Sequence, residues 1–399
     1  MKLSEELKWR GFVSENTFVD PSELDKKTRK FYWGTDPSAD SLHIGHLAAL
    51  MMVGCFIDHG YEPTLLVGGG TGLIGDPKMD KERPIKPLEE IEQNSESLAR
   101  QLRQLMGEDI KIVNNIDWLG DMGFFKFQGE VGRYFSMTQL MDRDFVKART
   151  GEGGTGLSVA EFTYSLLQGY DFLHLYRTYG IDLQLCGVDQ VGNCMSGLHL
   201  IAKSAGGKAD IWSCPLIIDQ ASGRKFGKSE GNAVWLSPDK TSPYKFYQYW
   251  LNVDDAGVID YLKIYTKLDK TAVDSLEKSV QSNPAAREAQ KTLAYEVTKL
   301  VHGEDTADAV KRATAVLFGS EDLTDETLAI LERELPTLEA GISVIEALTE
   351  SGIASSNGDA QRLIKGNAIS LNRGKIQADQ KIDSKTLLKK GKNQFILIK

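Results

Sequence analysis

Residues 30–218 alternate between short apolar runs and longer stretches in which apolar and polar positions are mixed. In the mixed stretches, apolar residues recur at spacings of three and four, which predicts amphipathic helices. The short apolar runs predict strands that are buried in a sheet. We therefore predict strands at 30–34, 63–68, 110–114 and 182–187, and helices at 44–58, 88–106, 160–176 and 192–203. This alternation is typical of an α/β domain with a largely parallel sheet.

The pattern changes twice after this region. From Pro243 to about Leu317 the strand signals vanish and Ala, Glu, Lys and Leu dominate, which predicts an α-helical domain. Residues 319–340 are acidic and indicate a linker. The rest predicts a small α+β module, with helices at 342–351 and 358–365 and strands at 368–371, 374–378 and 394–398. The expected division of the chain is 1–235, 236–318, 319–340 and 341–399.

The composition is that of an ordinary globular protein. Of 399 residues, 41% are hydrophobic and 26% are charged, which excludes a disordered chain and fits two or three domains. No apolar run approaches the roughly 20 residues of a membrane-spanning helix, and the N-terminus has no basic-then-apolar signal pattern. We therefore expect a cytoplasmic protein. The four cysteines form no CxxC pair, so we expect reduced, buried thiols and no metal-ligating residue.

Charge is unevenly distributed along the chain. The formal net charge of −9 argues against indiscriminate binding of nucleic acid by the whole surface. Residues 351–399, however, hold ten basic residues against three acidic ones, a formal charge of +7, which leaves −16 for the remainder. A compact basic module favours RNA as a partner, although a cluster of lysines is often only a solvated surface.

The segment from Tyr32 to His46 places an apolar strand, a turn and the first turn of a helix in succession. A helix start binds phosphate through its unpaired N–H groups and positive dipole end, and Asp40 or Ser41 is expected to cap this helix. His43 and His46 are three residues apart and share a face, from which they would donate hydrogen bonds to phosphate. An HxxH pair alone is more often a plain surface feature, but its position after a strand favours a site.

A glycine-rich segment, 67–77, follows the second predicted strand. Gly70, Gly72 and Gly75 match GxGxxG, the fingerprint of a dinucleotide-binding turn, which would indicate a nicotinamide-dependent oxidoreductase. The context argues against that function, because Asp76-Pro77 interrupts the required helix and residues 78–96 are charged and helical. The alternatives are a plain turn, or a backbone passing close to a small ligand, with the Asp76 carboxylate available for an ammonium group.

Other polar groups are placed where a ligand would meet them. Tyr164, Gln168 and Asp171 are four and three residues apart among apolar neighbours, so they share a helix face. Their partners would be a polar ligand or, more commonly, a satisfied core network. Asp189 directly follows an apolar strand, at the edge where open α/β sheets bind ligands, and its carboxylate would accept ribose hydroxyls.

Two lysines, Lys225 and Lys228, lie in a glycine-flanked loop that begins at Gly223. Ammonium groups that meet negative charge only in the transition state lower the barrier of a reaction in which pyrophosphate departs. Taken alone, the loop is a solvated basic segment. The order of all these segments along the chain decides between the two interpretations.

In this order the segments resemble those of the class I aminoacyl-tRNA synthetases, with His-Ile-Gly-His at 43–46 and Lys-Phe-Gly-Lys-Ser at 225–229 in place of the two class signatures. The details resemble the bacterial-type tyrosyl-tRNA synthetases, whose segments match 68–77, 164–172 and 187–193. The resemblance covers nearly the whole chain. It implies a doubly wound, Rossmann-like catalytic domain with an insertion, an α-helical domain and a C-terminal S4-like RNA-binding module.

The resemblance also implies roles for individual residues. The catalytic signatures would be His43, His46, Lys225, Lys228 and Ser229. The ammonium group, ring and phenol hydroxyl of tyrosine would be held by Tyr32, Asp76, Asn115, Tyr164, Gln168, Asp171 and Gln190. ATP would be bound by Gly34, Asp36, Ser38, His43, Gly45, His46, Gly187, Asp189 and Lys228. In the S4-like module, tRNA would be bound by Arg362, Lys365 and Arg373.

The activity that the family implies has two steps. Tyrosine and ATP form tyrosyl-adenylate and pyrophosphate, and the tyrosyl group then passes to the 3′ end of tRNA(Tyr). Mg²⁺ is expected to accompany the ATP, and no organic cofactor is expected. The family is homodimeric, and the apolar stretch 124–141 is a candidate interface.

Two related alternatives remain at this point. The tryptophanyl-tRNA synthetases share the fold and the motif order, but Tyr32, Asp171 and the S4-like module favour tyrosine. A catalytically silent RNA-binding paralogue is disfavoured by the intact histidine and lysine signatures. The chain departs from the family at Trp33, where a small residue is common, and at Val191, where tryptophan is common. Further candidates for phosphate contact are Lys78, Lys81 and Arg83.

Overall fold

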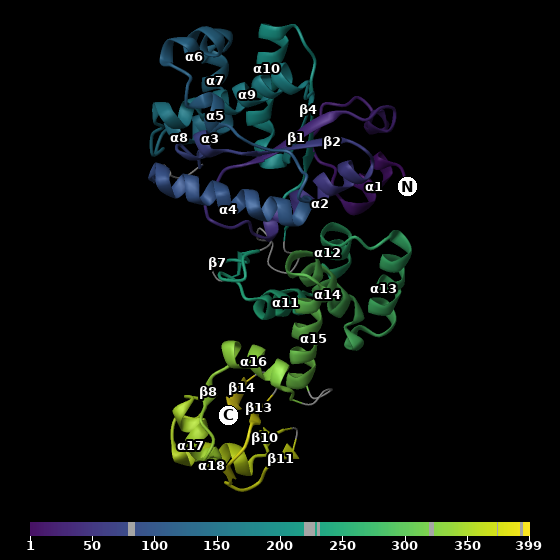
Figure 1. Cartoon of the computed structure of the whole chain (residues 1–399), viewed down its shortest axis with the longest axis vertical. Helices are drawn as coiled ribbons and strands as arrows, with labels where there is room; N and C mark the ends of the chain where they lie inside the picture. Colours follow the sequence, from purple (N-terminus) through teal and green to yellow (C-terminus); the bar gives the residue numbers. More distant parts are fainter. Residues whose placement is uncertain (79–83, 219–227, 230–231, 319–322, 373, 392–393) are drawn as a thin grey trace. The chain divides into compact units, whose positions relative to one another are not determined.

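The structure is a computed structural model and describes residues 1–78, 84–218, 228–229, 232–318, 323–372, 374–391 and 394–399 (Figure 1). The chain divides into two compact units. The first contains residues 1–241 and 253–293, and the second contains residues 242–252 and 294–399. Each unit therefore draws on two separate stretches of the chain.

A five-stranded parallel sheet forms the centre of the first unit (Figure 1). Its order is β3-β2-β1-β4-β5, from strands β1 (Lys30–Thr35), β2 (Glu62–Val67), β3 (Ile112–Asn114), β4 (Leu183–Gly187) and β5 (Asp210–Cys214). The strand order reverses between β1 and β4, which is where open α/β sheets bind ligands. The predicted doubly wound fold is confirmed, and the four predicted strands are β1 to β4; β5 was not predicted.

Strand β1 is the middle strand of this sheet. Tyr32 lies beside Thr64 of β2 and beside Gln184 of β4. The last four residues of β2, 64–67, are all buried. Consecutive burial means that both faces of the sheet are covered, as in other parallel sheets.

Helices surround the sheet and continue beyond it. The longer ones of the first unit are α1 (Leu3–Arg10), α2 (Ile44–Asp58), α4 (Leu88–Met106), α9 (Val159–Tyr179), α10 (Val191–Ala205), α12 (Val258–Tyr265) and α13 (Lys270–Ser282). Shorter ones are α3 (Gly69–Gly72), α5 (Ile116–Leu119), α6 (Phe124–Glu130), α7 (Met137–Met141) and α8 (Asp144–Thr150). The bounds predicted for α2 and α4 are confirmed.

Helix α9 is longer than predicted because its ends carry caps. Ser158 accepts the N–H of Glu161, and the Glu161 side chain accepts the N–H of Ser158, which together form a capping box. At the other end, Gly180 has a φ of 68°, a left-handed conformation that glycine adopts without a Cβ penalty. The caps therefore define a helix that extends three residues beyond the predicted end at 176.

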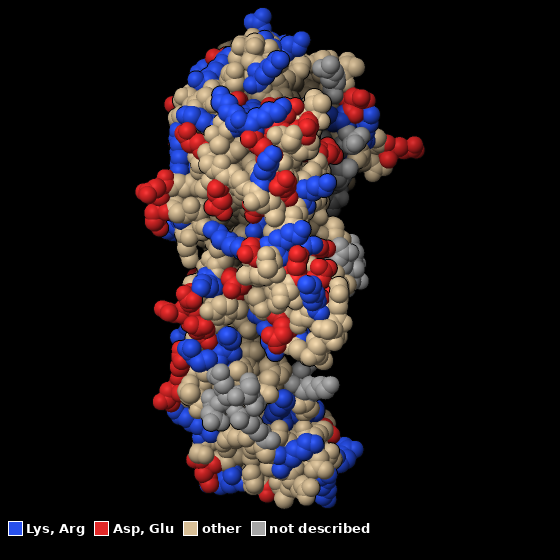
Figure 2. All heavy atoms as spheres, turned by 90° about the vertical axis from the view of Figure 1, so that its right-hand side faces the viewer, with Lys and Arg blue, Asp and Glu red and all other residues tan. Residues whose placement is uncertain are grey.

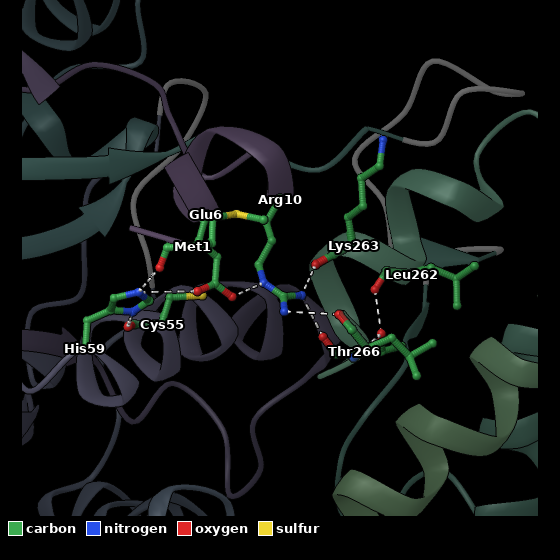
Figure 3. Close-up of polar contacts among 9 residues, drawn as sticks. Met1, Glu6, Arg10, Cys55, His59, Leu262, Lys263 and Thr266 are labelled. Atoms are coloured by element: carbon green, nitrogen blue, oxygen red, sulfur yellow. Dashed lines mark hydrogen bonds and ion pairs between the residues drawn. The ribbon is translucent and has the colours of Figure 1, made fainter. Parts of the chain in front are cut away.

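Arg10 fastens parts of the first unit that are far apart in the sequence (Figure 3). Its guanidinium donates to three backbone oxygens at the end of α12, those of Lys263, Thr266 and Leu268. Its Nε lies 2.8 Å from Glu6, and Glu6 lies 3.7 Å from Nε2 of His59, the residue that ends α2. The C-terminal ends of α2 and α12 are thereby tied to α1.

The second unit combines helices with a small mixed sheet. Its helices are α11 (Pro243–Leu251), the later part of α14 (Glu288–His302), α15 (Glu304–Phe318), α16 (Asp325–Glu334), α17 (Val344–Glu350) and α18 (Asn357–Lys365). Its main sheet has the order β11-β10-β13-β14-β8, from β8 (Thr337–Leu338), β10 (Ile369–Leu371), β11 (Gly374–Lys375), β13 (Thr386–Lys390) and β14 (Gln394–Ile398). A second pair consists of β9 (Ile342–Ser343) and β12 (Lys381–Ile382).

The two faces of this sheet belong to different cores. Leu388 and Ile396 pack with Leu348 of α17 and Ile364 of α18. The alternate residues, among them Leu387, Phe395 and Leu397, pack with Val316 and Leu317 of α15 and with Leu328 and Leu331 of α16. The helical segment and the small module therefore share a hydrophobic core within the second unit.

This shared core revises the expectation of an acidic linker over 319–340. Residues 325–334 form α16, because Leu328 and Leu331 are three residues apart and place apolar groups on one helix face. Residues 337–338 form β8, which pairs in parallel with β14. Asp325 and Glu326, two of the acidic residues that gave the segment its linker character, are exposed.

Candidate active site

The candidate residues gather where strands of the parallel sheet end. Asp36 follows β1, Gly68 follows β2, Asn115 follows β3, and the turn 188–190 follows β4. Because parallel strands end at the same edge of a sheet, these four segments lie at one edge. The structure thus brings together most of the residues that the sequence singled out.

His43 is the N-cap of α2, so the expectation that Asp40 or Ser41 caps this helix is wrong. The His43 Nδ1 accepts the N–H of Gly45 at 3.0 Å, and the His46 Nδ1 accepts the N–H of His43 at 3.2 Å. An imidazole nitrogen therefore takes the place of the usual hydroxyl or carboxylate acceptor. Ser41 has another role, since its hydroxyl accepts the N–H of Ser237.

The two imidazoles lie close together at the start of α2. Their ring centroids are 3.9 Å apart. Since each Nδ1 accepts a backbone hydrogen, each neutral ring carries its proton on Nε2 and presents a hydrogen-bond donor there. Gly45 is required by this packing, because a Cβ at that position would lie 2.8 Å from the His43 ring.

The segment that follows the predicted lysine loop, 223–229, lies beside the start of α2. Lys225 lies outside the described residues. Lys228 and Ser229 form strand β6 (Lys228–Ser229), which pairs with β7 (Asn232–Ala233). The next residue, Val234, accepts the N–H of Ile44 at 3.0 Å. The backbone that carries Lys228 therefore leads within a few residues to the histidine pair.

A buried hydrogen-bond network centres on Asp171 of α9. Its Oδ2 accepts from the Asn115 amide at 2.9 Å, and its Oδ1 accepts from the Trp118 indole at 2.8 Å. Asn115 also donates to Thr71, and Thr71 donates to Asp36 at 2.7 Å. The network thus joins residues from α9 and from the segments that follow β1, β2 and β3.

Burial gives the Asp171 carboxyl an unusual pKa. Loss of solvation raises the pKa to about 7, while the hydrogen bonds from Asn115 and Trp118 oppose this rise and the charge of Asp36 adds to it. Asp171 is 2% exposed. A carboxyl with such a pKa can serve as a strong acceptor near neutral pH, and such groups are concentrated at functional sites.

Two tyrosines line the same region. The Tyr164 hydroxyl donates to Asp36 at 2.8 Å, and burial raises the pKa of Tyr164 well above its ordinary value. Burial likewise raises the pKa of Tyr32, with contributions from Cys194 and Asp171. The Tyr32 hydroxyl is buried and has no hydrogen-bond partner among the described residues. A buried polar atom of this kind needs a partner, and a polar ligand would supply one.

Asp76 lies in a second cluster of polar side chains. Its two carboxylate oxygens accept from the amides of Gln190 and Asn193, each at 3.0 Å. Gln168 of α9 contacts the Cys194 thiol instead, with its Nε2 3.8 Å from the sulfur, and its Oε1 has no partner among the described residues. Asp76 and Gln190 are thus brought together as the resemblance implied.

The glycine-rich segment packs against the protein's own side chains. A Cβ at Gly68 would lie 2.2 Å from the Asp36 carboxylate, and one at Gly69 would lie 2.4 Å from the Asn114 amide. The backbone N–H of Gly69 and of Gly70 donate to Asn114 and Asn115. The close approach that these two glycines allow is therefore to neighbouring side chains of the protein itself.

The remaining nucleotide candidates are placed as follows. A Cβ at Gly187 would lie 2.6 Å from the Asp189 carboxylate, so glycine lets that side chain fold back over β4. Gly34 packs on Leu66, and Ser38 donates its N–H to the Asp36 carbonyl. The two departures from the family lie in ordered elements, because Trp33 is buried in β1 and Val191 begins α10.

A buried ion pair supports the Asp76 segment. Arg149 lies 3.0 Å from Glu161 at both carboxylate oxygens, and both side chains are at most 3% exposed. The same guanidinium donates to the Lys78 carbonyl at 2.8 Å and to the Gly156 carbonyl at 2.7 Å. It therefore ties the chain just after Asp76 to the start of α9. Lys81 and Arg83 lie outside the described residues.

The RNA candidates lie in the second unit. Arg362 of α18 is 80% exposed and lies 3.6 Å from Asp359, and Lys365 ends the same helix in an exposed position. Arg373 lies outside the described residues. On the face drawn in Figure 2, blue side chains predominate over red ones at the lower end, which is the C-terminal module.

Sequence reasoning missed Trp118, Thr71 and Asn193, which complete the two clusters. Trp118 lies three residues after Asn115, so the helical spacing that linked Tyr164 to Asp171 could have found it. Among the described residues no group of three or more potential ligands is arranged for a metal ion, and all four cysteines are free and buried. In the same part of the chain no helix is long and apolar enough to cross a membrane.

Comparison with known proteins agrees with this geometry. A family described as tRNA synthetases class I (W and Y) matches residues 24–319. The chain is 40% identical to the tyrosine–tRNA ligase of Bacteroides fragilis (strain YCH46), over 100% of this chain and 99% of that protein. It is also 40% identical to the tyrosine–tRNA ligase of Geobacillus stearothermophilus, over 100% of both chains.

Solved structures show the same relationship. A C-terminally truncated mitochondrial tyrosyl-tRNA synthetase of Coccidioides posadasii has a TM-score of 0.68 and 29% identity, and covers 78% of this chain and 91% of its own. The tryptophanyl-tRNA synthetase of Plasmodium falciparum shares the fold, with a TM-score of 0.55, 15% identity, and coverage of 82% and 88%. The chain therefore belongs to the class I tRNA synthetases of the tryptophan and tyrosine type, and within them it groups with the tyrosine–tRNA ligases.

Proposed function

We propose that the chain acts as a tyrosine–tRNA ligase through the residues assembled at the edge of the parallel sheet. The activity itself follows from full-length relatives that are tyrosine–tRNA ligases. The observation that carries the choice of substrate is the buried Tyr32 hydroxyl, which has no partner among the described residues and lies near Asp171. A phenol hydroxyl would satisfy both groups, because it can accept one hydrogen bond and donate another.

In this proposal Asp171 and Tyr32 select tyrosine. Asn115 and Trp118 each donate to one oxygen of Asp171 and hold its carboxylate in place. Phenylalanine would leave both Asp171 and Tyr32 without the partner that the phenol supplies, and unpaired buried groups are expensive. Tyrosyl-tRNA synthetases discriminate against phenylalanine in this way by about 10⁵. Tryptophan offers an N–H donor and no acceptor, so it would leave the Tyr32 hydroxyl unsatisfied.

The ammonium group of tyrosine would lie among Asp76, Tyr164 and Gln168, with Gln190 nearby. The oxygen of Gln168 is buried without a partner among the described residues and would accept an ammonium hydrogen. Asp76 supplies the negative charge, and its amide neighbours Gln190 and Asn193 orient it. Arg149 would keep the Asp76 segment close to α9, because it contacts both the Lys78 carbonyl and Glu161.

ATP would bind across the histidine pair. His43 and His46 would donate from Nε2 to phosphate oxygens at the N-terminus of α2, where the helix dipole also favours negative charge. Asp189 beside Gly187 would accept the ribose hydroxyls. Gly34 near the end of β1, with Asp36 and Ser38 just after it, would complete the nucleotide site. Mg²⁺ would enter as part of the nucleotide substrate.

The chemistry then needs positioning and positive charge rather than a protein nucleophile. The tyrosine carboxylate attacks the α-phosphate, the bond to the β-phosphate breaks, and pyrophosphate leaves. Lys225, Lys228 and Ser229 would stabilise the charge that develops on the departing group. In the second step a hydroxyl of the terminal ribose of tRNA attacks the carbonyl carbon of the adenylate, and AMP leaves.

The second unit would bind tRNA. Its basic C-terminal module, with Arg362, Lys365 and Arg373, suits contact with phosphate. A homodimer through 124–141 and a cytoplasmic location complete the proposal. Phe124 and Phe125 are 69% and 89% exposed, which supports an interface there.

The experiment that tests this function is exchange of labelled pyrophosphate into ATP, measured with each standard amino acid separately. We expect exchange with tyrosine alone. Exchange with tryptophan would indicate a tryptophanyl-tRNA synthetase instead. No exchange with any amino acid, in folded protein, would favour a silent RNA-binding paralogue.

A further inference from the structure

A histidine that the proposed function does not use lies against the Asp171 network. His174 follows Asp171 by three residues on α9, so the two side chains share a face of the helix. Its imidazole stacks on the indole of Trp118, with ring centroids 4.3 Å apart and planes 13° apart. The same indole donates its N–H to Oδ1 of Asp171 at 2.8 Å. One turn of α9 therefore contacts the indole both at its N–H edge and on its face.

Trp118 needs this support because of the helix that carries it. Trp118 belongs to α5, which has four residues, and Asn115 directly precedes that helix. These two residues supply the hydrogen bonds to the two oxygens of Asp171. A single helical turn has little stability of its own, whereas α9 has 21 residues and a cap at each end. The ring on α9 is thus the more rigid partner and orients the indole.

The imidazole of His174 has a fixed place along α9. Its Nε2 lies 3.5 Å from the Thr178 hydroxyl, and its ring centroid lies 6.3 Å from that of Tyr170. These three residues are four apart and form a row on the helix. Burial, together with the charge of Lys126, lowers the pKa of His174, so the ring is mostly neutral at pH 7. It therefore offers the indole a flat aromatic face that carries little charge.

We propose that His174 is a positioning residue for the selection of tyrosine: by stacking on Trp118, it keeps the indole N–H directed at Asp171. This role rests on the proposed function, in which Asp171 and Tyr32 meet the phenol of the substrate. A hydrogen bond weakens steeply as its donor turns away from the acceptor. A tilted indole would leave one carboxylate oxygen without its donor, and the carboxylate would then be free to turn away from the phenol. Such a pocket discriminates less well against phenylalanine.

A role in packing alone predicts a different result. If His174 only filled space, its removal would change kcat/KM for tyrosine and for phenylalanine alike, because both amino acids present the same ammonium group and carboxylate. A positioning role changes the ratio of the two values, because only tyrosine brings the hydroxyl that meets Asp171.

The test measures kcat/KM for tyrosine and for phenylalanine by pyrophosphate exchange in the full-length protein. Trp118→Phe keeps a ring but removes the donor, and should lower the ratio of the two values about ten- to a hundredfold, the range for one hydrogen bond to a charged group. His174→Ala should lower it about two- to tenfold, the range for one aromatic pair. His174→Phe keeps a flat ring and should restore the ratio of the wild type.

A double variant shows whether His174 acts through the indole. The ratio of His174→Ala with Trp118→Phe should equal that of Trp118→Phe alone, because the N–H that His174 positions is already absent. The control His199→Ala removes another half-buried histidine, whose ring lies 5.1 Å from that of Phe135, and should leave the ratio unchanged. His174→Leu repeats the test with a side chain that fills the space, should His174→Ala not fold.

The outcomes separate this inference from the function on which it rests. The positioning role is overturned by an unchanged ratio in His174→Ala and His174→Leu, by an equal loss in His174→Phe, or by a further loss when His174→Ala is added to Trp118→Phe. An unchanged ratio in Trp118→Phe itself would refute the proposed Asp171 pocket as well. A folded wild-type protein without tyrosine-dependent exchange would refute the activity.

Discussion

In the proposed function, the Asp171 pocket of the first unit and the basic surface of the second unit would recognise their partners by opposite physical means. The pocket buries its polar groups, and burial raises the pKa of Asp171 to about 7. Arg362 and Lys365 are exposed, so the contribution of each to binding would be small and would depend on salt. The comparison teaches that the proposed pocket would select a small substrate by the cost of leaving buried groups unpaired, whereas the basic surface would hold RNA by many weak contacts.

The largest effect should appear in the pH dependence of stability at Asp171. Its folded pKa lies above its ordinary value of 3.8, so the folded protein binds the proton more tightly and its stability falls as pH rises from about 4 to about 7. Asp171→Asn cannot ionise. The free energy of unfolding of the variant, relative to wild type, should therefore rise by about 3 kcal/mol between pH 5 and pH 8. A constant difference across that range, in urea titrations, would contradict the shifted pKa.

Lys228→Ala should reduce the rate of adenylate formation about a hundred- to a thousandfold, which is the usual effect of removing one group that stabilises transition-state charge. Tyrosine affinity should stay nearly unchanged, because the proposed contact forms only as pyrophosphate departs. Pre-steady-state measurement of adenylate formation and equilibrium binding of tyrosine would separate the two quantities. An equal loss in both would assign Lys228 to ground-state binding.

Reversing charge on α18 tests the other side of the comparison. Arg362→Glu with Lys365→Glu should weaken tRNA binding about tenfold or more at low salt, and the loss should shrink as salt rises. Pyrophosphate exchange should not change. The control pair Lys27→Glu with Lys291→Glu alters net charge equally in the first unit. If both pairs weaken tRNA binding alike, only the total charge of the protein matters.

The smallest effect should come from Tyr32→Phe, which removes one hydroxyl. Loss of one neutral hydrogen bond to the substrate should lower kcat/KM for tyrosine about two- to tenfold and leave kcat/KM for phenylalanine unchanged or slightly higher. Steady-state pyrophosphate exchange with both amino acids measures this ratio. Equal changes for both substrates would show that the hydroxyl does not meet the phenol.

Local patterns predicted most of the first unit and less of the second. The apolar runs of β1 to β4, and the apolar residues spaced three and four apart in α2 and α4, each lie within one element and therefore predicted it. β5 and β13 were missed: β5 pairs with β4, which precedes it by the whole of α10, and β13 pairs with β10 and with its hairpin neighbour β14. We predicted a linker in place of α16 because acidic residues dominate this segment. Its two buried leucines, Leu328 and Leu331, pack against residues of β13 and β14, which the local sequence does not reveal.

The candidate site shows the same limit. Spacing along α9 correctly placed Tyr164 and Asp171 together, since both join the network that includes Asp36. The bond between Asn115 and Asp171 spans 56 residues and could come only from the family resemblance or the structure. The cap of α2 was missed for a different reason, because histidine is seldom considered as an N-cap residue.

The Arg10 tie described above bears on how the chain matures during synthesis. Arg10 is made early, but the carbonyl of Lys263 that it holds lies 253 residues later. At roughly 5–20 residues per second, ribosomes need on the order of 13–50 s to cover that distance. During this interval the guanidinium can pair with Glu6 but lacks its three backbone acceptors at the end of α12. The contacts between Arg10 and residues 263–268 of the first unit can therefore form only after residues 242–252, which belong to the second unit, have been synthesised.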